Sequence, residues 1–224
     1  MACVLTDKIP HPDFLNADYI FHHENAVAEL KRIEIDNVDS PNNQAKLNAA
    51  INEYYLAGKI KTKEVSESNW HELPRELQNT IYNVTTNAIK TQIEKANKQI
   101  KETKIRLGLK TYKGVLIIVN DGVQSYPPAM FVHAIFRLLL HQYSGITSFI
   151  FLTANVFVKT REHPMPIQCW ISIDMEKDGK MSPALSNNLH EAWKALVTKK
   201  TGIPSYKVEM NDVEGFWKAK SLRL

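Results

Sequence analysis

The sequence contains two cysteines, Cys3 and Cys169, among 224 residues. Two thiols are too few for a disulfide framework or a thiolate zinc site, and this favours a reducing compartment. No apolar run approaches the roughly 20 residues that a membrane span needs. Asp7 and Lys8 also interrupt the amino-terminal apolar stretch, unlike a signal peptide. These absences predict a soluble, cytoplasmic protein with no membrane partner.

A strong excess of one charge is also missing. The formal net charge is +4 and the isoelectric point is about 8.9, which permits contact with phosphate but does not identify a nucleic-acid binder. Hydrophobic residues make up 44% of the chain, enough to bury a core. We therefore expect a single domain over residues 1–224, with a core at about 13–160 and a strand–helix extension at about 161–224.

Apolar runs alternate with helical patterns along most of the chain. This alternation predicts an α/β fold, with a mixed central sheet flanked by helices. The longest helical pattern ends at Gly108 and is long enough to contain one break. The sequence Asn120-Asp121-Gly122 predicts a turn after a buried strand, rather than a ligand site. The expected strands are 17–21, 26–31, 114–119, 148–152 and 168–174, and the expected helices are 41–56, 73–107, 127–143 and 187–200.

The first two strands are separated by residues 22–25 and predict a hairpin in which Phe21 faces Ala26. In that register Tyr19 pairs with Ala28 and Ala17 with Leu30, with large side chains against small ones on one face. Asp18 then lies opposite Glu29. The other face carries Asp18, Glu29 and Lys31 together with two apolar residues, Ile20 and Val27.

Two carboxylates placed opposite each other repel unless a cation or a shared proton lies between them. Oxygen ligands without a nearby thiolate favour Mg²⁺ or Mn²⁺, and substrate phosphate and water can complete the coordination shell. Lys31, two residues after Glu29, lies on the same side of the strand. Its ammonium could orient water or offset phosphate charge. This layout is typical of phosphodiester hydrolysis.

An acid on one strand followed by acid-x-lysine on the next resembles the signature of the PD-(D/E)XK nuclease superfamily. The matching segments run from Asn16 to Phe21 and from Ala26 to Lys31. The resemblance implies a restriction endonuclease-like fold and a metal held by Asp18, Glu29 and the Leu30 carbonyl, with Lys31 assisting hydrolysis.

Members of this superfamily often add a glutamine or lysine from a following helix. Gln99 is the first candidate here and Gln44 the second. Asp13, within a literal Pro12-Asp13, is an alternative first acid if the strand begins earlier. Acid-x-lysine also occurs at Glu102-Thr103-Lys104, within the long helical pattern, and at residues 178–180, within a turn. Of the three instances, only the first follows a facing acid on a strand.

The favoured hypothesis is a Mg²⁺- or Mn²⁺-dependent endonuclease of restriction-like or genome-defence type. Its partner would be nucleic acid, DNA rather than RNA, and a homodimer or a partner subunit stays open. A second hypothesis is a non-catalytic protein that keeps the nuclease fold as a regulatory or nucleic-acid-binding subunit. A third is an unrelated α/β protein whose solvated hairpin carries Lys31 as a counter-charge to the two acids.

Overall fold

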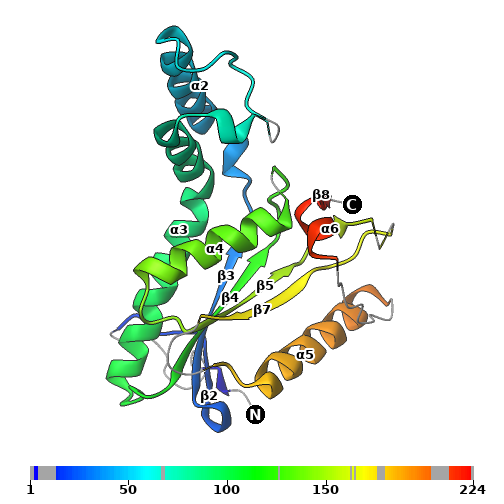
Figure 1. Cartoon of the computed structure of the whole chain (residues 1–224). Coiled ribbons are helices and arrows are strands. Elements are labelled where there is room, and N and C mark those ends of the chain that lie inside the picture. Colours follow the sequence, from blue (N-terminus) through cyan, green and yellow to red (C-terminus); the bar gives the residue numbers. More distant parts are fainter. Residues whose placement is uncertain are drawn as a thin grey trace.

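The computed structural model describes residues 3–4, 14–66, 69–125, 127–161, 163, 165–175, 180–202 and 212–222. These residues form an α/β fold in which helices flank a mixed sheet, as the alternating pattern predicts (Figure 1). The strands are β1 (Cys3–Val4), β2 (Tyr19–Phe21), β3 (Ala26–Ile33), β4 (Lys113–Asn120), β5 (Ser148–Thr153), β6 (Phe157–Lys159), β7 (Trp170–Asp174) and β8 (Lys220–Leu222). The α-helices are α2 (Pro41–Leu56), α3 (Arg75–Arg106), α4 (Pro128–Gln142), α5 (Pro183–Thr201) and α6 (Val213–Trp217), and short 3₁₀ turns occupy His22–Glu24, Asn37–Asp39 and Trp70–Glu72.

The main sheet has six strands in the order β1-β2-β3-β4-β5-β7. Strands β3, β4 and β5 are parallel, whereas β2 and β7 run antiparallel to their neighbours β3 and β5. Every residue of β4 after Lys113 is buried. A central parallel strand is covered on both faces, which explains its nearly continuous apolar sequence.

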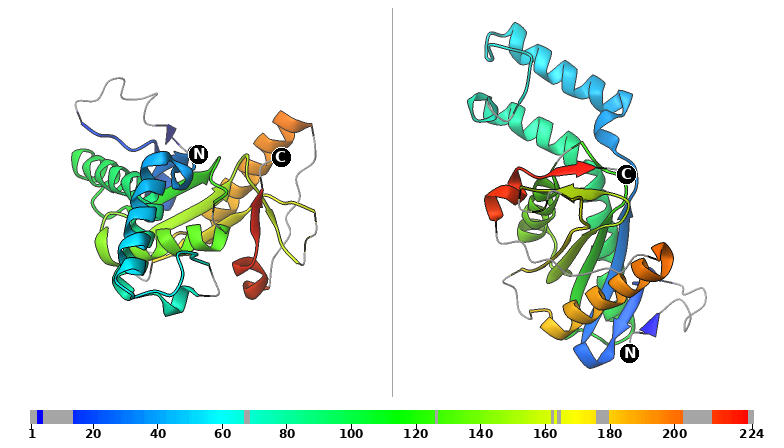
Figure 2. Two further views of the ribbon diagram at one scale, coloured as in Figure 1. Left: turned by 90° about the horizontal axis from the view of Figure 1, so that it is seen from above. Right: turned by 90° about the vertical axis from the view of Figure 1, so that its right-hand side faces the viewer.

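Helices cover the two faces of the sheet unequally. One core contains Ile93 and Ile100 of α3, Ile135 of α4 and the β3 residue Val27. The opposite core contains Leu185 of α5. The views in Figures 1 and 2 agree, with α3 and α4 on one side of the sheet and α5 on the other. Because α3 packs directly across β3, its side chains can reach the hairpin that carries the acids.

Helix boundaries follow local signals closely. The hydroxyl of Ser40 accepts a hydrogen bond from the Asn43 amide and Pro41 occupies the first turn of α2, as expected of an N-cap followed by proline. Helix α3 is a single 32-residue helix, so the break that its length allowed does not occur. Its first half and α2 together project beyond the sheet (Figures 1 and 2).

Several small elements were not predicted. Strands β6 and β8 form a separate two-stranded antiparallel sheet, with α6 just before β8. Strands of three residues give too little periodicity to be recognised, and their pairing joins segments that are far apart in the chain. Within the described part of the chain, no helix combines the length and apolarity needed to cross a membrane.

Candidate functional site

The hairpin formed by β2 and β3 has the predicted register. Tyr19 pairs with Ala28, Ile20 with Val27 and Phe21 with Ala26. Each aromatic ring faces an alanine, and this large-against-small packing fixes a register that would invert every side chain if it slipped by one residue. The segment 22–25 turns the chain through a 3₁₀ turn, and Asn25 adopts a left-handed conformation with φ of 47°.

Strand β2 is shorter than the predicted strand 17–21, because the regular pairing stops at Tyr19. Ala17 was expected to pair with Leu30 on the face of Tyr19. Instead it is fully buried in the opposite core, with Ile20 and Val27. Its amide donates a 2.7 Å hydrogen bond to the hydroxyl of Thr103 on α3. The prediction for Ala17 is therefore wrong, because a tertiary contact bends the chain just before β2.

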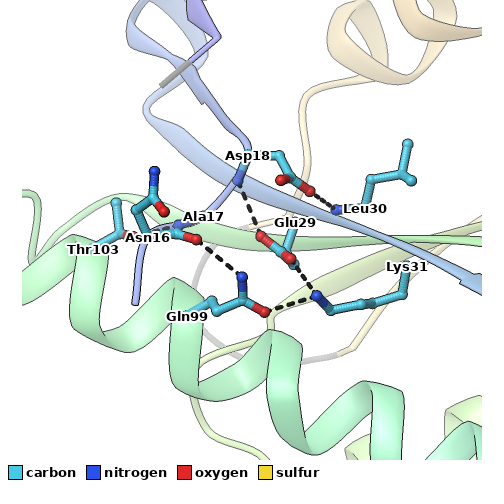
Figure 3. Close-up of polar contacts among 8 residues, drawn as sticks. All are labelled: Asn16, Ala17, Asp18, Glu29, Leu30, Lys31, Gln99 and Thr103. Carbon is cyan, nitrogen blue, oxygen red and sulfur yellow. Dashed lines mark hydrogen bonds and ion pairs between the residues drawn. The ribbon is translucent and has the colours of Figure 1, made fainter. Parts of the chain in front are cut away.

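Asp18 lies at this bend, immediately before β2 (Figure 3). One of its carboxylate oxygens, Oδ2, accepts a 2.9 Å hydrogen bond from the Leu30 amide. Its own amide donates to Oε2 of Glu29 at 3.0 Å. Asp18 and Glu29 are thus neighbours, as predicted. The prediction that Asp18 shares a face with Glu29 and Lys31 is wrong, however, because the Asp18 carboxylate bonds to the Leu30 amide at the sheet edge where Ala17 would have paired.

Glu29 is the most deeply buried acid among the described residues, with 1% of its surface exposed. Burial raises the pKa of Glu29 from its ordinary value of 4.5 to about 7; the hydrogen bond from Lys31 opposes this rise and the negative charge of Asp18 adds to it. A buried carboxylate beside a second acid is costly for a fold. This combination of burial and a specific charge partner is typical of functional sites.

Lys31 and Gln99 complete the cluster on the side of Glu29 that faces α3 (Figure 3). The Lys31 ammonium lies 2.5 Å from Oε1 of Glu29 and 2.7 Å from Oε1 of Gln99. The Gln99 amide nitrogen donates in turn to the Asn16 carbonyl at 3.0 Å. Gln44, the second candidate, instead donates to the Val38 carbonyl. Of the two glutamines, the fold brings Gln99 to the acids.

The oxygen atoms at this edge are of the chemical kind that hard divalent cations bind. The carbonyls of Asn25 and Ile33 accept hydrogen bonds from the amides of Lys113 and Asp121, so the odd-numbered residues of β3 bond to β4. Backbone groups alternate in direction along a strand, and the amide and carbonyl of Leu30 therefore point toward β2. The Leu30 carbonyl therefore shares an edge with the Asp18 carboxylate. The carboxylate oxygens of Asp18 and Glu29 can each accept more than one hydrogen bond, and the bonds described above occupy Oδ2 of Asp18 and both oxygens of Glu29 once each. Two carboxylates and a carbonyl suffice when phosphate and water supply the remaining ligands.

The number of possible metal ligands at this edge is nevertheless small. No group of three or more His, Cys, Asp or Glu side chains suited to a metal ion occurs in the described ranges. Any cation at this edge would have to rely on the Asp18–Glu29 pair. Asp13, the alternative first acid, lies outside the described residues.

Asp121, at the end of β4, has structural partners. Its carboxylate accepts hydrogen bonds from Arg32 and from the Asn155 amide, and it is 5% exposed. The neighbouring Asn120 side chain bonds to the backbone of Gly122 and Val123. These contacts agree with the predicted turn.

Thr103 is the residue that the sequence-based prediction missed. It belongs to the Glu102-Thr103-Lys104 segment, which indeed lies in α3 and not on a strand. The available signal was its spacing, because Thr103 follows Gln99 by four residues and so lies on the same face of the helix. A buried threonine one turn from a candidate site residue is a position worth testing.

Comparisons with known proteins do not place the chain in a family. The sequence matches no protein-family model, and neither the curated proteins nor the solved structures give a match.

Proposed function

We propose that this protein is a divalent-metal-dependent nuclease with a restriction endonuclease-like fold of the PD-(D/E)XK class. The observation that carries the proposal is the buried Glu29 carboxylate, held between the Asp18 amide and the Lys31 ammonium. An acid followed by acid-x-lysine is the superfamily pattern. Here Glu29 and Lys31 lie on β3, and Asp18 immediately precedes β2 with its amide bonded to Glu29. A restriction-like or defence endonuclease acting on DNA fits this pattern.

The proposed roles follow from the chemistry of each group. Asp18, Glu29 and the Leu30 carbonyl would hold one Mg²⁺ or Mn²⁺ ion at the sheet edge. Such an ion, when bound, supplies Lewis-acid stabilisation of phosphate charge and lowers the pKa of a coordinated water. Lys31 would place its positive charge beside the phosphate that is attacked. Gln99 would hold the Lys31 ammonium in position through its 2.7 Å hydrogen bond.

The direct Lys31–Glu29 contact also favours a second candidate function. A lysine already paired with the buried acid at 2.5 Å neutralises it without any metal. The same fold could then act without catalysis, as a nucleic-acid-binding or regulatory subunit. The two functions differ in whether phosphodiester bonds are broken.

A cleavage assay separates the two functions. Purified protein is incubated with plasmid and with single-stranded DNA and RNA, in Mg²⁺, in Mn²⁺ and in EDTA. A metal-dependent nuclease should cleave only with metal, and Glu29→Ala and Lys31→Ala should each lower the rate about 100-fold or more. Intact substrate with every metal, accompanied by measurable binding of the nucleic acid, would support the binding subunit instead.

The chain offers a control ion pair for these variants, which is matched at its lysine. Lys194 and Glu191 form an ion pair of 2.9 Å on α5, across the sheet from α3. The Lys194 side chain is 19% exposed, close to the 15% of Lys31, whereas Glu191 is 64% exposed and Glu29 only 1%, so the lysine variants are the matched comparison. Glu191→Ala and Lys194→Ala remove the same chemical groups elsewhere and should leave cleavage unchanged. A similar loss of activity in both pairs would indicate a general effect on folding.

A further inference from the structure

The peptide group that joins Asn16 to Ala17 is held at both of its polar atoms by α3. Its carbonyl oxygen accepts a hydrogen bond from the Gln99 amide at 3.0 Å, and its N–H donates to the Thr103 hydroxyl at 2.7 Å. Gln99 and Thr103 lie one helical turn apart. This peptide unit, one residue before Asp18, is thus held to α3 through both its carbonyl and its N–H (Figure 3).

Thr103 uses its hydroxyl differently from the other threonines of α3. Thr80, Thr85, Thr86 and Thr91 each donate to the carbonyl four residues earlier in the same helix. This back-bonding is the ordinary behaviour of a helical threonine. The Thr103 hydroxyl accepts from a segment 86 residues away, and its side chain is fully buried.

The clamp redirects two hydrogen bonds that a regular hairpin would make. Continuation of the β2–β3 register would pair Ala17 with Leu30, each amide donating to the carbonyl of the other. In the structure the Ala17 amide donates to Thr103 and the Leu30 amide to the Asp18 carboxylate. The Leu30 carbonyl is thereby released from Ala17, and Asp18 is fixed at the same edge.

We propose that Thr103 is a positioning residue of the active site, which holds the Asn16–Ala17 peptide on α3 so that Asp18 and the Leu30 carbonyl are directed to a common cation. The inference rests on the proposed nuclease function. Loss of the hydroxyl leaves the Ala17 amide without its acceptor on α3. The Asn16–Ala17 peptide would then be held only through Gln99, and the Asp18 carboxylate could move away from the Leu30 amide.

The test compares Thr103→Val, which keeps the shape without the hydroxyl, with Thr103→Ser, which keeps the hydroxyl. Thr86→Val is the matched control, since Thr86 is also buried on α3 but bonds only within the helix. It lies roughly 25 Å from Thr103 along the helix axis. Amide hydrogen exchange at Ala17 shows whether the bond is lost, and calorimetry gives the Mn²⁺ dissociation constant.

Faster exchange at Ala17 and a roughly 10- to 100-fold weaker Mn²⁺ affinity are expected for Thr103→Val, because outer-shell partners of metal ligands have effects of this size. Its cleavage rate should recover toward the wild-type value at saturating Mn²⁺. Because bound metal also stabilises a folded protein, circular dichroism without Mn²⁺ must show that Thr103→Val is folded before this recovery is assigned to the metal site. Thr103→Ser and Thr86→Val should resemble the wild type in metal affinity.

An unchanged Mn²⁺ affinity in Thr103→Val, together with faster exchange at Ala17, would overturn the inference and leave the proposed nuclease intact. Wild-type protein that neither binds Mn²⁺ nor cleaves nucleic acid would instead remove the proposed function, and this inference with it. If circular dichroism shows that Thr103→Val does not fold, Thr103→Ala is tested in its place, because it removes the same hydroxyl acceptor and has a smaller side chain. The Mn²⁺ affinity and the exchange rate at Ala17 are then interpreted in the same way for Thr103→Ala.

Discussion

Oε1 of Gln99 lies 2.7 Å from Nζ of Lys31, although 68 residues separate the two in the sequence. The same ammonium contacts Glu29, so Lys31 is held between a helix and a strand that pack against each other. A lysine restrained in this way has lost much of its rotational freedom before any substrate arrives. The effect of the position of Lys31 can therefore be tested by substituting its helical partner, Gln99.

Gln99→Leu should lower the cleavage rate about 10- to 100-fold, since a hydrogen bond to a charged group contributes roughly 1.5–3 kcal/mol. The fold should persist, because leucine has a similar volume. Gln44→Leu is the control, as Gln44 also donates from a helix to a backbone carbonyl. Single-turnover rates at saturating metal measure both. Equal rates for the two variants would contradict the role given to Gln99.

Glu29→Gln should change how stability depends on pH in the metal-free protein. The pKa of Glu29 is about 7 in the folded chain and near 4.5 when the group is fully solvated. A raised pKa in the folded state stabilises the protein below about pH 4.5, and this stabilisation is lost as the pH rises through 7. Glutamine does not titrate, so the variant should lack this loss.

Urea denaturation in EDTA at a series of pH values measures this effect. Between pH 5 and pH 8 the free energy of unfolding of the wild type should fall relative to that of Glu29→Gln, by on the order of 2 kcal/mol. Parallel curves for the two proteins would show that Glu29 titrates normally.

Calorimetric titration with Mn²⁺ should give one bound ion per chain. Asp18 and Glu29 are the two carboxylates at the site, and hard cations need several oxygen ligands each. Asp18→Asn keeps an oxygen that can accept from the Leu30 amide but removes the negative charge. It should weaken binding about tenfold or more, whereas Glu29→Ala should abolish it. A stoichiometry of two would be inconsistent with this donor set.

Asp121→Asn should affect stability and spare activity. The buried Asp121 carboxylate pairs with Arg32, whose side chain is 55% exposed, so solvent screens part of their attraction. A loss of about 1–3 kcal/mol in the free energy of unfolding is expected. Cleavage measured well below the melting temperature should match the wild type. A selective loss of cleavage would instead place Asp121 in the site, at the carboxyl end of the parallel strands.

Much of the fold could be predicted from the sequence, because the signals that define it are local. The pairing of Tyr19 with Ala28 and of Phe21 with Ala26 follows from alternation along two short runs. Ser40 and Pro41 mark the start of α2, and the apolar run after Gly114 marks the central strand. Short strands such as β6 and β8 were not predicted, because three residues are too few to show the alternation of a strand.

The amino-acid sequence by itself determined that Glu29 and Lys31 share one face of β3 and that Asp18 lies close to Glu29, because strand alternation and a four-residue turn leave few other registers. Only the tertiary structure decided which glutamine joins them and where the Asp18 carboxylate points. Both depend on α3 crossing β3, which brings Gln99 and Thr103 against Asn16 and Ala17 from more than 80 residues away. Hydrogen bonds across such separations are set by helix packing, which local sequence patterns do not encode.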